Sequence, residues 1–159
     1  MKKVITLTLV SALALSVSVT AFAAQINQDT PEPKKTDAVI KTSIAPTYTV
    51  TIPADVTVEF NAETTTFGQI KLDSAQIEPD KCIKVSLTTD GELNNKVDKA
   101  KVIPYTVKSG ENSFTSANYL SAGDSTDLTI NIATADWNKA YAGEYTDTVT
   151  FEVSYENKA

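Results

Sequence analysis

Few side chains in this chain are able to do chemistry. The full sequence has no histidine, one cysteine (Cys82) and 14 basic residues, all of them lysine. The lack of histidine excludes Ser-His-Asp and Cys-His catalysis and histidine-bound zinc. A single cysteine excludes a cysteine-rich metal site and an internal disulfide. We therefore predict no catalytic residues, no metal and no cofactor, and we expect a protein that is not an enzyme.

Paired carboxylates are the remaining catalytic arrangement, because two Asp or Glu residues are enough to cleave a glycosidic bond. Asp124 and Asp127 form one such pair, and Glu144 and Asp147 form another. The first pair lies in a polar turn and the second on a predicted strand, so ordinary solvated positions account for both. Residues 121–127 also offer oxygen ligands for calcium, but they lack the spacing of an EF-hand loop.

Two aromatic side chains are candidates for ligand contact. Trp137 and Tyr141 lie in residues 133–141, which have the pattern of a single helical turn. Aromatic rings bind sugar rings and also anchor protein contacts. We predict Trp137 and Tyr141 as candidate contacts to a carbohydrate, which would make the protein a carbohydrate-binding module. The alternative for a lone Trp is core packing.

The first 24 residues have the three parts of an export signal. Lys2 and Lys3 form a basic start, an apolar run covers residues 4–19, and residues 21–23 (Ala-Phe-Ala) form a cleavage site. The apolar run is too short for a stable membrane span. We expect residues 1–24 to be removed, with no membrane insertion afterwards. The mature protein is then secreted, extracellular or at the cell surface.

The charge of the chain argues against nucleic acid as a partner. Full-length net charge is −6, and removal of the two signal lysines makes it more negative. Phosphate backbones require clustered cations. An acidic surface without arginine therefore predicts no binding to nucleic acid.

Alternation of apolar and polar residues is the main structural signal, and no helical stripe of useful length is present. It predicts strands at residues 38–44, 48–52, 56–60, 66–72, 82–87, 102–107, 128–132 and 145–155. Short alternating strands separated by turn residues are typical of a sandwich. The prediction is an all-β fold: an immunoglobulin-like antiparallel β-sandwich of seven to nine strands at residues 37–159. A polar, proline-containing flexible arm at 25–36 precedes it, and residues 88–100 are predicted to form a surface loop.

Cys82 begins one of these strands. Its neighbours alternate, so its side chain lies on one face of the sheet. It serves either as a small buried hydrophobic residue or as a cross-link between copies.

The C-terminal segment 140–155 carries the most specific pattern. Gly143 gives the backbone freedom for a tight entry into a long strand. One face of that strand carries Tyr145, Asp147, Val149, Phe151, Val153 and Tyr155. The segment resembles the final strand of secreted fimbrial subunits and of the spore coat protein U family. In fimbrial subunits a glycine precedes a near-terminal aromatic residue by twelve residues, which is the interval from Gly143 to Tyr155.

The resemblance implies a mode of assembly. Fimbrial subunits are incomplete sandwiches, and the N-terminal arm of a neighbour adds the missing strand. Residues 25–44 are then a candidate donor strand; alternatively, residues 38–44 complete the sheet of their own copy. The resemblance implies a structural or adhesive surface protein that associates through strand edges with itself or with another surface protein. The residues to which it assigns a structural role in assembly are Gly143, Tyr145, Val149, Phe151, Val153 and Tyr155.

Overall fold

The computed structural model describes residues 25–158, so the predicted signal at 1–24 lies outside the described residues. Among the described residues the chain divides between Ala45 and Pro46 into two compact units. Residues 25–45, here called the arm, have a turn near Asn27, where the Thr30 N–H donates to the Asn27 carbonyl. The arm has no strand or helix, and almost all of its side chains are exposed. The second unit is a sandwich.

The sandwich is built of strands, with one helical turn. The strands are β1 (Thr47–Thr51), β2 (Thr64–Gln76), β3 (Lys81–Thr88), β4 (Glu92–Asn95), β5 (Val102–Pro104), β6 (Thr106–Ser109), β7 (Asn112–Ser113), β8 (Ser116–Tyr119), β9 (Ser125–Asn131), β10 (Tyr145–Thr146) and β11 (Thr150–Asn157). The turn α1 covers Thr134–Trp137, within the residues for which a helical turn was predicted. The predicted all-β sandwich is confirmed, although its strands are more numerous than expected, because the strands predicted at 102–107 and 145–155 are each divided in two.

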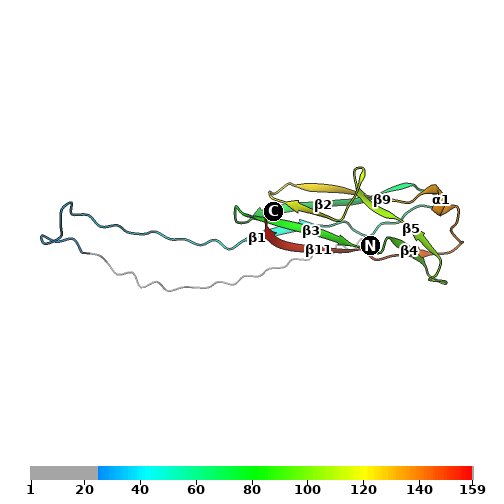
Figure 1. Ribbon diagram of the computed structural model, residues 1–159, viewed down its shortest axis with the longest axis horizontal. Coiled ribbons are helices and arrows are strands. Elements are labelled where there is room, and N and C mark those ends of the chain that lie inside the picture. Colours follow the sequence, from blue (N-terminus) through cyan, green and yellow to red (C-terminus); the bar gives the residue numbers. More distant parts are fainter. Residues whose placement is uncertain (1–24, 159) are drawn as a thin grey trace. The chain divides into compact units, whose positions relative to one another are not determined.

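The strands form two layers (Figure 1). One layer is the sheet β1-β2-β9-β6-β7, and the other consists of the sheets β11-β3-β8 and β10-β4-β5. Every pairing is antiparallel. In the second layer, Thr150 pairs with Thr88 and Tyr145 with Asn95. Strand β10 therefore pairs with β4, and β11 pairs with β3. Together β10 and β11 form one long strand that is interrupted at residues 147–149.

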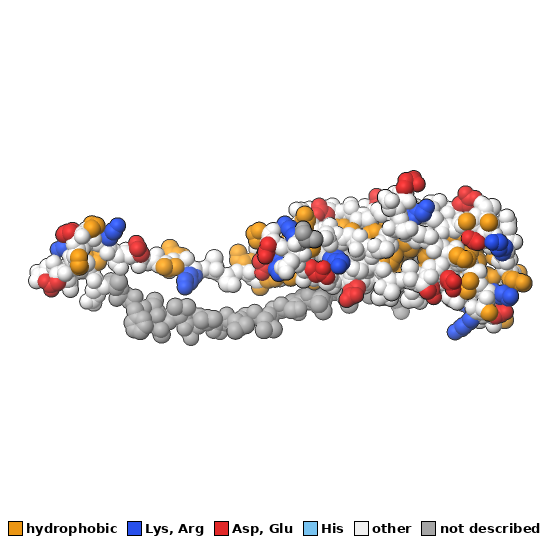
Figure 2. All heavy atoms as spheres, viewed as in Figure 1, with side chains coloured by type: hydrophobic (Ala, Val, Ile, Leu, Met, Phe, Trp, Pro, Cys, Tyr) orange, Lys and Arg blue, Asp and Glu red, His pale blue; other side chains and the backbone are white. Residues whose placement is uncertain are grey.

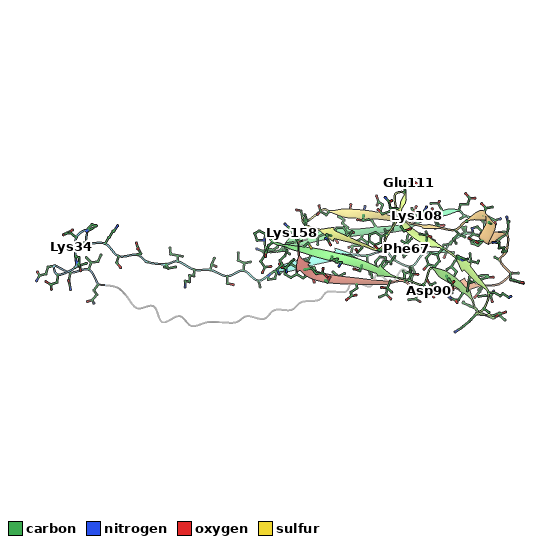
Figure 3. The ribbon with its side chains drawn as sticks, in the orientation of Figure 1. Lys34, Phe67, Asp90, Lys108, Glu111 and Lys158 are labelled. Atoms are coloured by element: carbon green, nitrogen blue, oxygen red, sulfur yellow. The ribbon has the colours of Figure 1, made fainter. Side chains whose placement is uncertain are left out.

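The core lies between the layers, because alternation turns one face of each strand inward. Its fully buried side chains include Ile70 and Leu72 from β2, Ile83 and Val85 from β3, and Leu128 from β9. Figure 3 shows Phe67 of β2 between the layers, and its ring centroid lies 5.9 Å from that of Phe151 in β11. Burying an aliphatic or aromatic side chain of this size stabilises the fold by about 1.5–3 kcal/mol.

The strand order matches an immunoglobulin sandwich that lacks its last strand. In constant-type domains the sheets are ordered A-B-E-D and C-F-G. Here β1, β2, β9 and β6 take the places of A, B, E and D, while β3 and β11 take those of C and F. Within residues 25–158, no strand pairs with the outer edge of β11 and takes the place of G.

Two predicted strands do not form. Residues 38–44 have no strand in the part of the chain that the structure describes. Residues 56–60 also lack a partner strand. The physical reason is Pro53, which cannot donate to the ladder. Pro53 packs closely against Gly68, at the point where the β2–β9 register shifts. A Cβ added to Gly68 would lie 3.2 Å from the Cβ of Pro53.

Two other local predictions also differ from the structure. The loop predicted at 88–100 contains β4, which pairs with both β5 and β10. The strand predicted at 102–107 is broken at Tyr105, where the chain crosses from one layer to the other. The Tyr105 N–H donates to the carbonyl of Gly91 at this point, 2.7 Å away.

Candidate functional site

An open groove of about 980 Å³ runs between the two layers near α1. Two segments of the chain supply most of its lining, residues 53–58 and residues 140–143 with 145–149, and we call them its first and second walls. Between them lie core side chains that include Phe67, Ile103 and Trp137. Figure 2 shows apolar side chains among the charged ones at this end of the sandwich. The groove therefore reaches from the surface into the hydrophobic core.

The first wall of the groove is an unpaired segment that follows Pro53. Residues 54–58 make no backbone hydrogen bond to any part of the chain that the structure describes. Val56 is 37% exposed and Phe60 is 74% exposed. Large apolar side chains beside an unpaired backbone are the features of an edge that accepts another strand.

The second wall is the long C-terminal strand, whose alternation was predicted correctly. Tyr145, Val149 and Phe151 pack against the core, while Thr146 and Thr148 are exposed. Farther along, Val153 and Tyr155 lie on the same inner face, and the Tyr155 ring stacks on Tyr48 at 6.2 Å. Among the described strands, none pairs with the outer edge of this one.

Gly143 lies at the start of this wall in a conformation that side chains rarely adopt. Its φ is +149°. A Cβ at this position would lie 2.6 Å from Nδ2 of Asn95, which is a buried polar residue. The tight entry predicted from the sequence is therefore also a close approach between β4 and the segment before β10.

Two hydroxyl groups and one carboxylate meet where three strands break, and two of the three residues, Tyr105 and Asp147, line the groove. The Tyr105 hydroxyl lies 2.5 Å from Asp147 Oδ2 and 2.7 Å from Thr89 Oγ1. The Thr89 hydroxyl also lies 3.1 Å from the same carboxylate oxygen. Burial raises the pKa of the Tyr105 hydroxyl above its usual value, and the hydrogen bond to Asp147 raises that pKa further. We call Thr89, Tyr105 and Asp147 the polar anchor.

Substituting Tyr105 tests the contribution of the polar anchor to stability. We expect Tyr105→Phe to lower the free energy of unfolding by about 1.5–3 kcal/mol, the range for a hydrogen bond to a charged group. A tyrosine pKa that is higher in the folded state gives stability that is lost as pH rises above about 10. Urea titrations at neutral and alkaline pH should show a weaker alkaline loss in Tyr105→Phe. An unchanged urea midpoint at neutral pH would contradict the assignment.

The structure separates the two aromatic residues that were candidates for sugar contact. Trp137 is 8% exposed, and its indole N–H donates to the Ala62 carbonyl at 3.0 Å. Its ring meets Phe60 edge to face at 5.7 Å. Tyr141 is 61% exposed at the mouth of the groove, with Lys101 Nζ 4.8 Å from its ring centroid. Trp137 therefore packs in the core, which favours the alternative of core packing, and presents no open face to a sugar ring.

The candidate acidic pairs have separate structural partners. Asp124 Oδ2 accepts from the N–H groups of Leu120 and Ser121, which lower the pKa of Asp124. Glu144 pairs with Lys96 at 2.6 Å, which lowers the pKa of Glu144. Cys82 is buried, with Sγ 3.8 Å from the Asn157 carbonyl oxygen, as expected for its reading as a small hydrophobic residue.

Within residues 25–158, no group of three or more His, Cys, Asp or Glu side chains is arranged to hold a metal ion. No helix in the same range has the length and apolarity to cross a membrane.

Sequence reasoning placed Tyr145, Val149 and Phe151 on one face but missed the opposite wall of the groove. The signal for that wall is Pro53, which follows an alternating strand and ends its ladder. Sequence reasoning also placed Asp147 on the apolar face and interpreted it, with Glu144, as an ordinary solvated position. A single carboxylate on an otherwise apolar face is the signal that a buried partner such as Tyr105 must exist.

No protein-family model matches this chain, and no curated protein matches it.

Proposed function

We propose that the mature protein is a secreted, non-enzymatic structural or adhesive surface protein whose copies associate through strand edges. In this proposal the groove accepts residues 38–44 of a second copy as an added strand. The observation that carries it is the groove itself: one wall has an unpaired backbone, the other ends in a strand with no partner on its outer edge within residues 25–158, and the interior is largely apolar. The resemblance of residues 140–155 to fimbrial and spore coat U subunits supports the same assignment.

The arm has the properties that such a strand requires. Val39 is 76% exposed, Ile40 is 99% exposed and Ile44 is 67% exposed. Burying each of these isoleucines would contribute about 1.5–3 kcal/mol, less the cost of ordering the arm. A strand of residues 38–44 spans roughly 20 Å, as does the wall from Tyr145 to Phe151.

Charge also favours this pairing. The residues that line the groove include Asp55 and Asp147 and no lysine. Residues 38–44 carry Lys41 and no acidic residue. An acidic groove attracts a strand that carries one positive charge. The groove should therefore bind residues 38–44 in preference to acidic segments of another copy.

Removal of the arm tests the proposal. We expect mature protein to form oligomers that grow with concentration, and a variant without residues 25–44 to stay monomeric. The matched control removes only residues 25–36 and should still associate. Size-exclusion chromatography with light scattering measures the mass, and negative-stain microscopy shows whether the oligomers are linear. Monomers throughout, or association that survives loss of residues 25–44, would refute the proposal.

A further inference from the structure

The inner face of the groove wall carries one charged side chain among apolar ones. Tyr145, Val149 and Phe151 pack against the core, and Asp147 lies between the first two on the same face. An inserted strand that follows this wall must therefore place some side chain beside a carboxylate. The other inward side chains of residues 145–151 carry no charge, so they place no such requirement on the inserted strand.

The carboxylate is fixed in place by the polar anchor. Asp147 Oδ2 lies within hydrogen-bond distance of the hydroxyls of Tyr105 and Thr89, and Oδ1 accepts from the Thr148 N–H at 2.6 Å. Tyr105 is only 8% exposed. The Asp147 side chain is thus held by three groups and has limited freedom to turn toward solvent. An apolar side chain pressed against it would remove water without replacing it, which is unfavourable.

The arm carries the complementary pattern on one face. In an extended strand, Ile40, Thr42 and Ile44 point the same way. This face of the arm therefore has a hydroxyl between two apolar side chains. The wall has a carboxylate, Asp147, between two largely apolar side chains, Tyr145 and Val149. The match is centred on Thr42 and Asp147, so it holds whether the added strand runs parallel or antiparallel to the wall.

We infer that Asp147 sets the register of the added strand by accepting a hydrogen bond from the Thr42 hydroxyl of a second copy. This inference rests on the proposed function and adds the residue pair that selects one alignment. Ile40 and Ile44 then lie against Tyr145 and Val149. A shift by two residues in either direction sets an isoleucine against the carboxylate and the Thr42 hydroxyl against an apolar side chain.

The opposite face of the arm offers a competing alignment. It presents Val39, Lys41 and Ser43, and Lys41 could form an ion pair with Asp147. That alignment would leave Ile40 and Ile44 in solvent and would place Ser43 against an apolar position. Burial of two isoleucines outweighs burial of one valine, because a partly exposed ion pair contributes about 1 kcal/mol or less.

The length of the chain favours Thr42 of a second copy. Tyr48 stacks on Tyr155, so the two residues lie at the same level of the sandwich. Asp147 lies eight residues before Tyr155, or roughly 26 Å along the strand. Thr42 lies six residues before Tyr48 and reaches at most about 21 Å when fully extended. Thr42 of the same copy would therefore approach Asp147 only with its tether fully stretched, whereas Thr42 of a second copy has no such limit.

A double-mutant cycle in the full mature chain tests the pair. Sedimentation equilibrium gives the association constant of Thr42→Val, Asp147→Val and the double variant. We expect Thr42→Val to weaken association roughly tenfold, as for a lost hydrogen bond to a charged group. The double variant should associate more tightly than either single variant, because two valines can pack together. Thr36→Val, the same change outside the added strand, is the control and should match wild type.

Disulfide trapping gives a second measurement if Asp147→Val fails to fold. In a Cys82→Ala background, a Val149→Cys chain is mixed with an Ile40→Cys or an Ile44→Cys chain and oxidised, so that Thr42 and Asp147 stay in place. We expect one of these two mixed disulfides, set by the direction of the added strand, to form readily, because side chains directly opposite each other in paired strands have Cβ atoms close together. A Ser43→Cys chain with the same Val149→Cys partner should cross-link far more slowly.

Two results would overturn the register and leave the proposed function standing. One is arm-dependent association in which Lys41→Ala or Ser43→Ala causes the loss expected of Thr42→Val. The other is a cycle in which the two single losses simply add, together with preferential trapping through Ser43→Cys. Absence of any arm-dependent association would overturn both the register and the proposed function.

Discussion

Replacing Gly143 by valine is expected to lower the free energy of unfolding by about 3–5 kcal/mol. A β-branched residue is strongly disfavoured at the positive φ of this position, +149°. Its Cβ would also lie 2.6 Å from Asn95 Nδ2. Asn95 cannot easily move aside, because its Oδ1 accepts from the N–H groups of Val97 and Asp98. The substitution therefore strains the backbone and disrupts the turn after β4.

Gly123→Val is the matched control for this prediction. Gly123 also has a positive φ, +97°, but nothing lies within 4 Å of a Cβ placed there. The Gly123→Val variant therefore measures how much a side chain at a positive φ lowers stability when no close contact is made. Urea denaturation of both variants should place Gly143→Val well below Gly123→Val in stability. Equal losses would mean that the contact with Asn95 contributes nothing and that the close approach is easily relaxed.

Gly143 illustrates what the sequence revealed about this end of the molecule. The glycine before a long alternating strand indicated a special backbone conformation, and the alternation correctly separated inward from outward residues. Its partner Asn95 was hidden, because residues 92–95 are Glu-Leu-Asn-Asn and have no strand pattern. Strand β4 forms because β5 and β10 supply hydrogen bonds on both of its sides. Such tertiary pairing overrides local propensity.

The two predicted strands that fail to form have a common explanation. Residues 38–44 and 56–60 both alternate in the way that a strand requires. Alternation determines which side chains share a face, but it carries no information about whether a neighbouring edge is available. In this structure neither segment has a partner, and one of them forms a wall of the groove. The predicted strand that fails to form at residues 56–60 is thus part of the candidate site.

Only one member of the polar anchor, Asp147, had a local signal. Thr89, Tyr105 and Asp147 come from three separate strand breaks, far apart in the sequence, and only the two-layer packing brings them together. Thr89 and Tyr105 alone look like ordinary loop or strand residues. The carboxylate on an apolar face was visible, but its partners follow from the topology, which alternation does not determine.

Trp137 is expected to be a core residue whose loss is as damaging as that of Gly143. Trp137→Ala should lower the free energy of unfolding by about 3–5 kcal/mol, the usual cost of truncating a buried tryptophan. The substitution removes the packing against Phe60 and leaves the Ala62 carbonyl without its indole donor. It also enlarges the groove from within, because Trp137 is part of its lining.

Tyr141→Ala is the control, because Tyr141 is exposed and lines the same groove. Its only ring contact of note is with Lys101, and an exposed cation–π pair contributes about 0.5–1 kcal/mol. Chemical denaturation followed by circular dichroism should therefore give a large loss for Trp137→Ala and a small one for Tyr141→Ala. If Trp137→Ala were as stable as wild type while binding to a glycan array disappeared, Trp137 would be a sugar platform. The carbohydrate-binding alternative would then replace strand association as the function of this groove.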